Sequence, residues 1–387
     1  MTCVLQVLPA LVTGGVERGT VDIAQALTAA GKPAIVASAG GPMVRELERV
    51  GATHVTLPLA AKAPWAIRRN ADALAALIRE RNVALVHARS RAPAWSAKQA
   101  CAITGTPFIT TFHGFYDQGP FGLKKHYNRV MAEGARVIAI SQAIAAHLRQ
   151  DYAVDEARLR VIHRGIDLAV FDPDRVSPQR LIQVTQKLRL TETIPTLMLP
   201  GRLTAWKGHH VLVDALAELK SRHRVADLRC LMVGSDQGRS AYADSIAERA
   251  AARGVADWVH VVQDCGDLPA AYLASDVVVS ASTKPEAFGR VVAEAQAMGR
   301  PVVAPSHGAA GEIIVPGVTG WLFTPGDPIS LADALHRALS LTEAARDDLA
   351  RTAMARVRAH FDKAEMCAKT LAVYDEVLAV AMPSGAP

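Results

Sequence analysis

The sequence has few cysteines and no long apolar run, and each of these absences excludes a class of protein. The five cysteines lie far apart, at positions 3, 101, 230, 265 and 367, and no two of them form a Cys-x-x-Cys pair. This spacing argues against a structural zinc site and a disulfide framework, and it favours a reducing, cytoplasmic environment. No unbroken apolar stretch is long enough to cross a bilayer as a helix. The first residues, MTCVLQVLPALVTGG, lack the basic start of a signal peptide, so we expect a first β-strand there.

Acidic residues are scarce in the first part of the chain. Residues 1–150 contain 17 Lys and Arg against 8 Asp and Glu, whereas the whole chain contains 43 against 37. A basic half favours an anionic partner, such as a phosphorylated substrate or an anionic membrane surface, although a solvated basic surface explains the charge equally well. The basic residues are not interleaved with aromatic residues as in sheets that stack RNA bases, so nucleic acid is not an expected partner.

The chain has 387 residues, enough for two domains, and its pattern is an apolar strand, a turn and an amphipathic helix, repeated. Alternation of this kind predicts an α/β fold with parallel sheets covered on both faces. The expected strands fall at 3–10, 33–38, 83–88, 107–113 and 136–141, and then at 196–204, 227–235, 258–264, 276–282, 301–306 and 320–326.

The alternation stops at RGIDLAVFDPDRVSP, which is rich in proline and aspartate. We therefore predict a first doubly wound domain at 1–170, a linker at 171–190 and a second doubly wound domain at 191–361. A last helix at 362–382 is expected to return to the first domain. Ligands of such sheets bind beyond the carboxyl ends of the strands, so we expect a site in a cleft between the domains.

A glycine pair, Gly14-Gly15, separates the first expected strand from a helix. Glycines let the backbone approach a ligand, and a helix N-terminus favours an anion. The G-x-G-x-x-G spacing of a dinucleotide site is absent, and the next strand ends without an acidic residue, so binding of NAD is disfavoured. An ordinary glycine turn explains the pair equally well.

The loop GRLTAWKG, residues 201–208, follows the first strand of the second domain and contains Arg202 and Lys207. Two cations beside a helix N-terminus suit a diphosphate, although the loop is not a Walker A motif. Taken by itself, the loop is more simply explained as two surface bases. His113 also ends an expected strand, beside Gly114, but a lone histidine more often has a structural role.

Two glutamates stand eight positions apart in STKPEAFGRVVAEAQAMG. Glu286 lies near the start of a helix, where an acidic residue gains about 0.3–1 kcal/mol from the helix dipole. Glu294 lies inside that helix among apolar neighbours, where a carboxylate is costly unless something hydrogen-bonds it. A buried arginine would explain Glu294, and so would the vicinal hydroxyls of a ligand, because a carboxylate accepts from both.

Taken together and in order, these motifs resemble the retaining nucleotide-sugar glycosyltransferases of the GT-B fold in glycosyltransferase family 4, also called glycosyl transferases group 1. The similarity covers nearly the whole chain and includes bacterial enzymes of the lipopolysaccharide-core type. The matching motifs are PEAFGRVVAEAQAMGRPVVAP, GRLTAWKG, VTGGVERG, HGFY and GVTGWLFTPGD.

The resemblance implies roles for the residues of the second domain. Glu294 would hold the ribose hydroxyls of the nucleotide, and Glu286 would contact hydroxyls of the donor sugar. Backbone amides around Phe288 and Gly289 would lie near the sugar and the diphosphate.

It also implies roles for the remaining candidates. Arg202 and Lys207 would neutralise the diphosphate as it leaves, Gly14 and Gly15 would approach it from the first domain, and His113 would lie beside the donor sugar. The candidate catalytic residues are therefore Glu286, His113, Arg202 and Lys207.

The leaving group of such a reaction is a nucleoside diphosphate, so its developing negative charge is the main thing to stabilise. The sequence offers no persuasive second carboxylate as a nucleophile, and the family is thought to retain configuration by same-face attack. No metal or other cofactor is expected, and Asp172-Pro173-Asp174 is interpreted as turn chemistry rather than a metal-binding DxD motif. The alternatives are an epimerase or hydrolase with the same donor site, and a non-catalytic nucleotide-sugar-binding protein.

The partners implied are a nucleotide-sugar donor and a glycan or lipid-linked acceptor, with lipopolysaccharide core or another envelope glycan as the leading class. The segment 113–131 mixes aromatic and basic residues, which suits an anionic membrane surface. We therefore expect a cytoplasmic enzyme at the inner face of the membrane, with a soluble acceptor and packed aromatic side chains as the alternative. The base of the donor, whether uridine, guanosine or adenosine, is left open.

Overall fold

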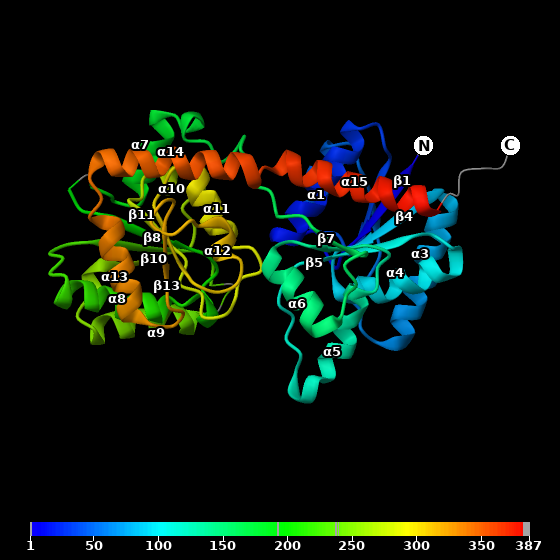
Figure 1. Ribbon diagram of the computed structural model, residues 1–387, viewed down its shortest axis with the longest axis horizontal. Coiled ribbons are helices and arrows are strands. Elements are labelled where there is room, and N and C mark those ends of the chain that lie inside the picture. Colours follow the sequence, from blue (N-terminus) through cyan, green and yellow to red (C-terminus); the bar gives the residue numbers. More distant parts are fainter. Residues whose placement is uncertain (1, 192, 237, 239, 382–387) are drawn as a thin grey trace. The chain divides into compact units, whose positions relative to one another are not determined.

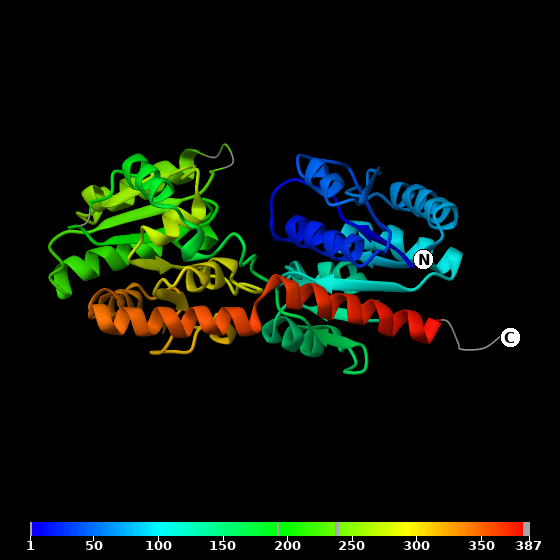
Figure 2. The ribbon, with the colours of Figure 1, turned by 90° about the horizontal axis from the view of Figure 1, so that it is seen from above.

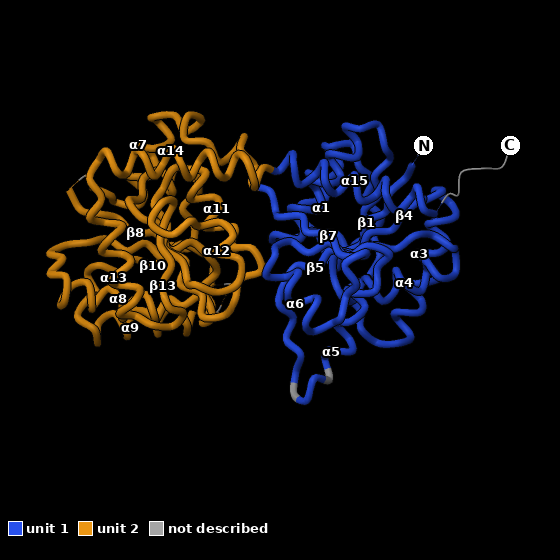
Figure 3. The backbone as a smooth tube through the Cα atoms, in the orientation of Figure 1, with its two compact units in different colours: residues 1–165, 363–387 blue, residues 166–362 orange. Residues whose placement is uncertain are grey.

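The computed structural model describes residues 2–191, 193–236, 238 and 240–381, without the side chains of residues 120 and 123. The chain divides into two compact units (Figure 3), one formed by residues 1–165 with 363–387 and the other by residues 166–362. The chain passes from one unit to the other after Gly165 and again after Asp362. Each unit is described by itself below.

The first unit contains a seven-stranded sheet of order β3-β2-β1-β4-β5-β6-β7, in which every strand pair is parallel. Its strands are β1 (Cys3–Val7), β2 (Ala34–Ser38), β3 (Thr53–Thr56), β4 (Val83–Ala88), β5 (Phe108–Phe112), β6 (Val137–Ala139) and β7 (Leu159–Val161). Its helices are α1 (Gly15–Ala29), α2 (Val44–Arg49), α3 (Pro64–Glu80), α4 (Arg91–Thr104), α5 (Leu123–Asn128), α6 (Gln142–Tyr152) and α15 (Lys363–Ala381).

Helices cover this sheet because alternate residues of the strands are apolar on both faces. Val4 and Leu85 point to one face, where they join a core with α1 and α15. The helices α3 and α4 pack on each other and against β4. The last helix therefore belongs to the same core as the first, although it lies at the other end of the sequence (red and blue in Figures 1 and 2).

The second unit contains a six-stranded parallel sheet of order β10-β9-β8-β11-β12-β13. Its strands are β8 (Thr196–Pro200), β9 (Arg229–Val233), β10 (Val259–Val262), β11 (Val277–Val279), β12 (Val302–Pro305) and β13 (Trp321–Phe323). Its helices are α7 (Pro178–Lys187), α8 (His209–Arg222), α9 (Ser240–Ala252), α10 (Leu268–Leu273), α11 (Arg290–Ala297), α12 (Ala310–Ile313), α13 (Pro328–Leu339) and α14 (Glu343–His360).

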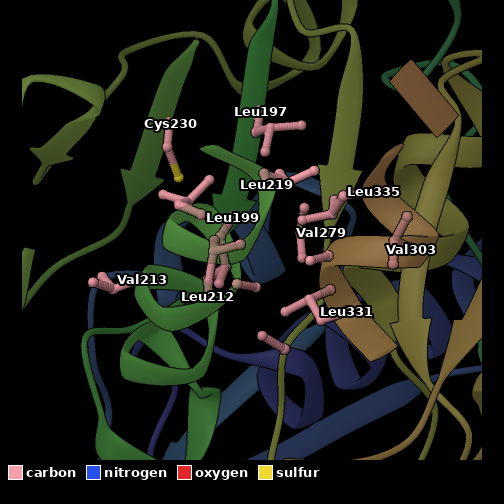
Figure 4. Packing of buried hydrophobic residues seen from close by; sticks show 14 of the residues in the cluster. Leu197, Leu199, Leu212, Val213, Leu219, Cys230, Val279, Val303, Leu331 and Leu335 are labelled. Atoms are coloured by element: carbon pink, nitrogen blue, oxygen red, sulfur yellow. The ribbon is translucent and has the colours of Figure 1, made fainter. Parts of the chain in front are cut away.

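The core of the second unit lies between its sheet and the helices α8 and α13. Leu197, Val279 and Val303 of the strands belong to one buried cluster with Leu212 of α8 and Leu335 of α13, and all five are labelled in Figure 4. The helix α11 packs against α14 and contacts β11 and β12. This packing fixes the loop between β11 and α11, which carries Glu286.

The predicted fold class, two doubly wound α/β domains with the last helix on the first, is confirmed. Two short strands at or near the edge of the first sheet, β3 and β7, were not predicted. The strand β3 was missed because none of its four residues is fully buried and its sequence, THVT, lacks an apolar run.

The prediction of a linker at 171–190 is wrong, because these residues belong to the second unit and contain its helix α7. Ser177 accepts a hydrogen bond from the backbone of Arg180, and Pro178 occupies the first helical position of α7. Arg180 then pairs with Asp267, the residue that caps α10. The linker was predicted from prolines and aspartates, and one of these prolines, Pro178, is with Ser177 a start signal of this helix.

Asp172-Pro173-Asp174 is turn chemistry, as predicted. The side chain of Asp172 accepts a hydrogen bond from the backbone N–H of Asp174 at 3.0 Å and caps the short 3-10 helix Pro173–Arg175. Within the part of the chain that the structure describes, no three His, Cys, Asp or Glu side chains gather as metal ligands.

Candidate active site

The candidate residues of the second unit lie on two loops at the carboxyl ends of neighbouring strands. Residues 201–208 follow β8 and lead into α8, and residues 280–289 follow β11 and lead into α11. Because β8 and β11 are adjacent and parallel, both loops leave the sheet at the same edge.

Glycine brings the two loops together. Gly208 has a φ of 76°, and a Cβ atom there would lie 1.8 Å from the carbonyl oxygen of Ala281. The backbone N–H of Thr283 donates to the carbonyl of Trp206 at 2.8 Å. A side chain at position 208 would push the loops apart, so this glycine sets the spacing on which the site depends.

Lys207 and Glu286 form an ion pair across these loops. Lys207 Nζ lies 2.8 Å from Glu286 Oε1, and the two side chains are only 14% and 19% exposed. The hydroxyl of Ser282 also donates to Oε1, and that of Ser280 lies 3.4 Å from it. Glu286 Oε2 accepts no hydrogen bond from the described residues, so it is available to a ligand hydroxyl.

Lys207 keeps capacity for a further acceptor. An ammonium group has three N–H donors, and one of them is used by Glu286. Its Nζ also lies 4.5 Å from the centre of the Trp206 ring, a cation–π contact. Arg202 is exposed on the same loop, and among the described residues its guanidinium has no hydrogen bond or ion pair. Both cations can therefore reach an anion at the start of α8.

Phe288 and Gly289 form the entry to α11. Phe288 is 3% exposed and packs edge-on against Phe361, with ring centres 5.7 Å apart. Gly289 caps the helix with a φ of 90°, a conformation that glycine adopts without strain. No side chain caps this helix, so its first backbone N–H groups are open to an acceptor.

Glu294 is buried, as the pattern indicated, and it has partners inside the protein. Its Oε1 lies 2.8 Å from Arg290, one helical turn earlier, and its Oε2 accepts a hydrogen bond from the Tyr272 hydroxyl at 3.0 Å. Burial raises the pKa of Glu294 above its ordinary value, while Arg290 and Tyr272 act to lower it. The arginine partner considered from the sequence is therefore present, four positions before Glu294. Each carboxylate oxygen can accept a second hydrogen bond, so these contacts leave room for a ligand.

The candidate residues of the first unit are joined by an arginine that the sequence analysis did not single out. Gly14 caps α1 and Gly15 begins it, after β1, and His113 follows β5. Arg164, which follows β7, donates to the carbonyl oxygen of Gly15, and its Nη1 lies 3.2 Å from His113 Nδ1. The glycine pair and the histidine are thus parts of one cluster at the carboxyl edge of the first sheet.

The structure therefore connects Lys207 with Glu286 in one unit, and Gly15 with His113 in the other. Four contributing residues were missed: Ser282, Tyr272, Arg290 and Arg164. The spacing of Arg290 and Glu294, four positions apart on one helix, could have predicted their ion pair from the sequence. Ser282 lies four positions before Glu286 in the same loop. Tyr272 and Arg164 are brought in by tertiary contacts, which no local pattern predicts.

A basic pocket of about 750 Å³ lies elsewhere in the first unit. Its charged lining residues are Lys62, Arg91 and Lys124, and it also reaches Ser90 and Tyr127. Ser90 caps α4 without a side-chain hydrogen bond, and the Tyr127 hydroxyl is buried without a partner among the described residues. Cations, an open helix N-terminus and a spare hydroxyl together suit a phosphate or carboxylate.

Two family models cover most of the chain. Residues 13–170 match the model described as Glycosyltransferase Family 4, and residues 183–355 match Glycosyl transferases group 1. Among curated proteins, the D-inositol 3-phosphate glycosyltransferase of Salinispora tropica is 35% identical over 219 residues, which is 54% of this chain and 45% of that protein. The corresponding protein of Xylanimonas cellulosilytica is 33% identical over 66% of this chain and 61% of its own length. The matches thus span 45% and 61% of the length of these two curated relatives, less than two thirds of either.

Solved structures match along nearly the whole chain. A glycosyltransferase from Rickettsia africae is 38% identical, with a TM-score of 0.89, over 97% of this chain and 98% of that one. Anabaena HepE in complex with UDP-glucose has a TM-score of 0.81 at 25% identity, over 96% of this chain and all of that one. WaaG, a glycosyltransferase involved in lipopolysaccharide biosynthesis, shares the fold at 18% identity. The chain belongs to the GT-B glycosyltransferases. Its first part matches Glycosyltransferase Family 4 and its second part matches Glycosyl transferases group 1.

Proposed function

We propose that this protein transfers a hexosyl-type sugar, with retention of configuration, from a nucleoside diphosphate donor to an anionic glycan or glycolipid acceptor. The observation that carries the proposal is the Lys207–Glu286 pair at the carboxyl edge of the second sheet. One ligand that presents a diphosphate and sugar hydroxyls would use both the spare donors of Lys207 and the open Oε2 of Glu286.

In this proposal, Arg202 and Lys207 stabilise the charge that develops on the departing diphosphate. Backbone N–H groups at the start of α11 serve the same ligand, and Glu294 accepts from the ribose hydroxyls. We assign no carboxylate as a nucleophile, because Glu286 is held by Lys207 and Ser282, and Glu294 by Arg290 and Tyr272. Same-face attack, with the donor phosphate taking the acceptor proton, is the proposed course, and it needs no metal.

The proposed donor is a UDP-sugar. HepE, which matches over nearly the whole chain at 25% identity, was solved with UDP-glucose. A uridine donor is therefore the first to test, with guanosine and adenosine donors as comparisons.

The proposed acceptor carries a phosphate or another anionic group that binds the basic pocket of the first unit. Lys62 is exposed and without a partner among the described residues, and Arg91 stands at the start of α4. The curated relatives are named for inositol 3-phosphate, a phosphorylated polyol. An envelope glycan with a phosphorylated core, such as lipopolysaccharide core, has the same chemistry.

A membrane-bound acceptor is part of this proposal, and the exposed Phe121 supports it. Three aromatic residues of segment 113–131 pack within the unit: Phe115 against His147, Tyr116 against Phe112 and Tyr127 against Trp95. Phe121 is fully exposed, close in sequence to Lys124 and Lys125. The proposed association is peripheral. None of the described helices has the length and apolarity to span a bilayer.

Thermal shift with UDP, GDP and ADP tests the donor proposal. A nucleotide at 100 times its Kd should stabilise the protein by about 2.7 kcal/mol. The same nucleotide should stabilise a Lys207→Ala, Arg202→Ala double variant far less. Failure of all three nucleotides to stabilise the wild-type protein would overturn the proposal.

Acceptor binding is tested by Lys62→Ala. We expect the KM for a phosphorylated acceptor to rise about fivefold to tenfold, because one charge-assisted contact is lost, while donor binding stays unchanged. Lys98→Ala, which removes another surface lysine of the same unit, is the control. Equal effects of the two substitutions would contradict the pocket assignment.

A further inference from the structure

The contact between Arg164 and His113 determines which ring nitrogen of the histidine carries the proton. Arg164 Nη1 lies 3.2 Å from His113 Nδ1. A guanidinium has only N–H donors and no acceptor, so Nδ1 must be the acceptor. The proton of the neutral imidazole is then on Nε2.

The surroundings of His113 keep the ring neutral. Burial lowers its pKa well below the ordinary value, and the nearby Arg89, Arg164 and His87 lower it further. Asp22 of α1 is an acidic group whose charge acts on Arg89. A protonated His113 would therefore be a third cation beside two buried guanidiniums.

Glycine makes room for these two guanidiniums. A Cβ atom at Gly19 of α1 would lie 2.8 Å from Nη2 of both Arg89 and Arg164. Arg89 and Arg164 are 4% and 8% exposed, and both line a small cavity together with His113. The arginines therefore occupy the space that a larger residue of α1 would take.

The other nitrogen of His113 is left without a partner. Nε2 is buried and makes no hydrogen bond to any described residue. A buried N–H without an acceptor costs about 1–3 kcal/mol, so we expect this group to find its acceptor when a ligand binds. An oxygen of a ligand would supply the missing acceptor.

We propose that Arg164 is a positioning residue that presets His113 as an Nε2–H donor to an oxygen of the bound sugar donor, and that holds the Gly15 turn in register with it. The proposal rests on the proposed function, because it takes the sugar donor as the ligand. His113 then acts as a hydrogen-bond donor through Nε2. It cannot act as a general base through Nδ1, because Nδ1 already accepts from Arg164.

Nitrogen-15 NMR of histidine-labelled full-length protein tests the tautomer without any activity. We expect the His113 signals of the wild-type protein to show a protonated Nε2 and an unprotonated Nδ1 at pH 7 and at pH 6. Arg164→Met should give a mixture of tautomers and a higher pKa for His113, whereas Arg164→Lys should restore the Nε2–H form. A wild-type ring protonated at Nδ1, or unchanged signals in Arg164→Met, would overturn the proposal.

Kinetics separate a positioning role from a structural one. Arg164→Met should lower kcat about tenfold or more through the lost hydrogen bond to the sugar, while bare UDP, which has no sugar, binds within about twofold of wild type. Arg158→Met is the control. Among the described residues, the side chain of Arg158 forms hydrogen bonds only with the backbone carbonyls of Ala132 and Gly134. An equal loss of kcat in both variants would contradict a positioning role. If the tautomer is found but no sugar is transferred, the proposed function fails and the assignment of the proton stands.

Discussion

At the scale of single residues, Lys207 and Glu286 are the two sequence candidates that the structure places in direct contact. Lys207 donates one N–H to Glu286, and in the proposed function its other N–H groups bind a phosphate of the donor. We expect Lys207→Ala to lower turnover about a hundredfold, because one contact to developing charge is worth about 3 kcal/mol. Steady-state kinetics measure this.

Lys220→Ala is a suitable control for that measurement. Lys220 lies near the end of α8, the helix that Lys207 precedes, and its Nζ bonds to the carbonyl of Gly254. Its loss should leave turnover unchanged. Near-normal turnover in Lys207→Ala, with the fold intact, would remove this residue from the site.

Glu294 and its internal partners make a second prediction at this scale. Glu294→Gln should weaken binding of bare UDP about tenfold or more, since a hydrogen bond to a charged group is worth about 1.5–3 kcal/mol. Tyr272→Phe removes only an internal hydrogen bond and should leave the affinity within about threefold. Isothermal titration calorimetry decides between them, and an unchanged affinity in Glu294→Gln would assign Glu294 a structural role.

At the scale of elements, the loop before α8 depends on the backbone of Gly208. Gly208→Ala should destabilise the protein by about 3 kcal/mol, because a positive φ costs about 1–2 kcal/mol and the clash with Ala281 adds to it. Gly254→Ala is the control, since Gly254 also has a positive φ but open space around it. Denaturant unfolding compares the two, and equal losses would contradict the proposed close approach of the loops.

The start of α8 also predicts a pH dependence. His209 is fully buried, and burial lowers its pKa from 6.5 to about 4, with smaller contributions from His210 and Lys207. The unfolded chain then binds a proton below pH 6.5 that the folded protein binds only near pH 4, so stability is lost as the pH falls through this range. Between pH 7 and pH 5, wild type should lose about 2 kcal/mol more than His209→Gln.

Unfolding of both proteins at the two pH values checks this prediction. The difference between the two pH-induced losses isolates His209 from the buried histidines of the first unit, which are common to both proteins. A variant that loses as much stability as wild type would show that His209 does not titrate in this way.

The elements also show what the sequence could and could not predict. The long apolar strands of both sheets were predicted because each is buried on both faces. The strand β3 was missed because it is an edge strand with no fully buried residue and no apolar run. The helix α7 was missed because prolines and aspartates are common in linkers, whereas here Pro178 occupies the first position of a helix. In the site, the glycines and the cations of 201–208 were visible as local patterns, whereas the bond from Arg164 to His113 joins residues 51 positions apart.

At the scale of the whole molecule, we propose a nucleotide-sugar site in the second unit and an anionic acceptor pocket in the first. The measurement that tests this most directly is the transfer itself. The full chain is incubated with UDP-, GDP- and ADP-hexoses and a phosphorylated acceptor, and the products are followed by liquid chromatography and mass spectrometry.

We expect that one nucleoside diphosphate, with UDP first, is released together with an acceptor that has gained one hexosyl residue. The rate of transfer should fall about a hundredfold in Lys207→Ala. Release of the nucleotide at the same rate without acceptor would instead indicate a hydrolase, and the absence of any product with all three donors would contradict the assignment of a glycosyltransferase.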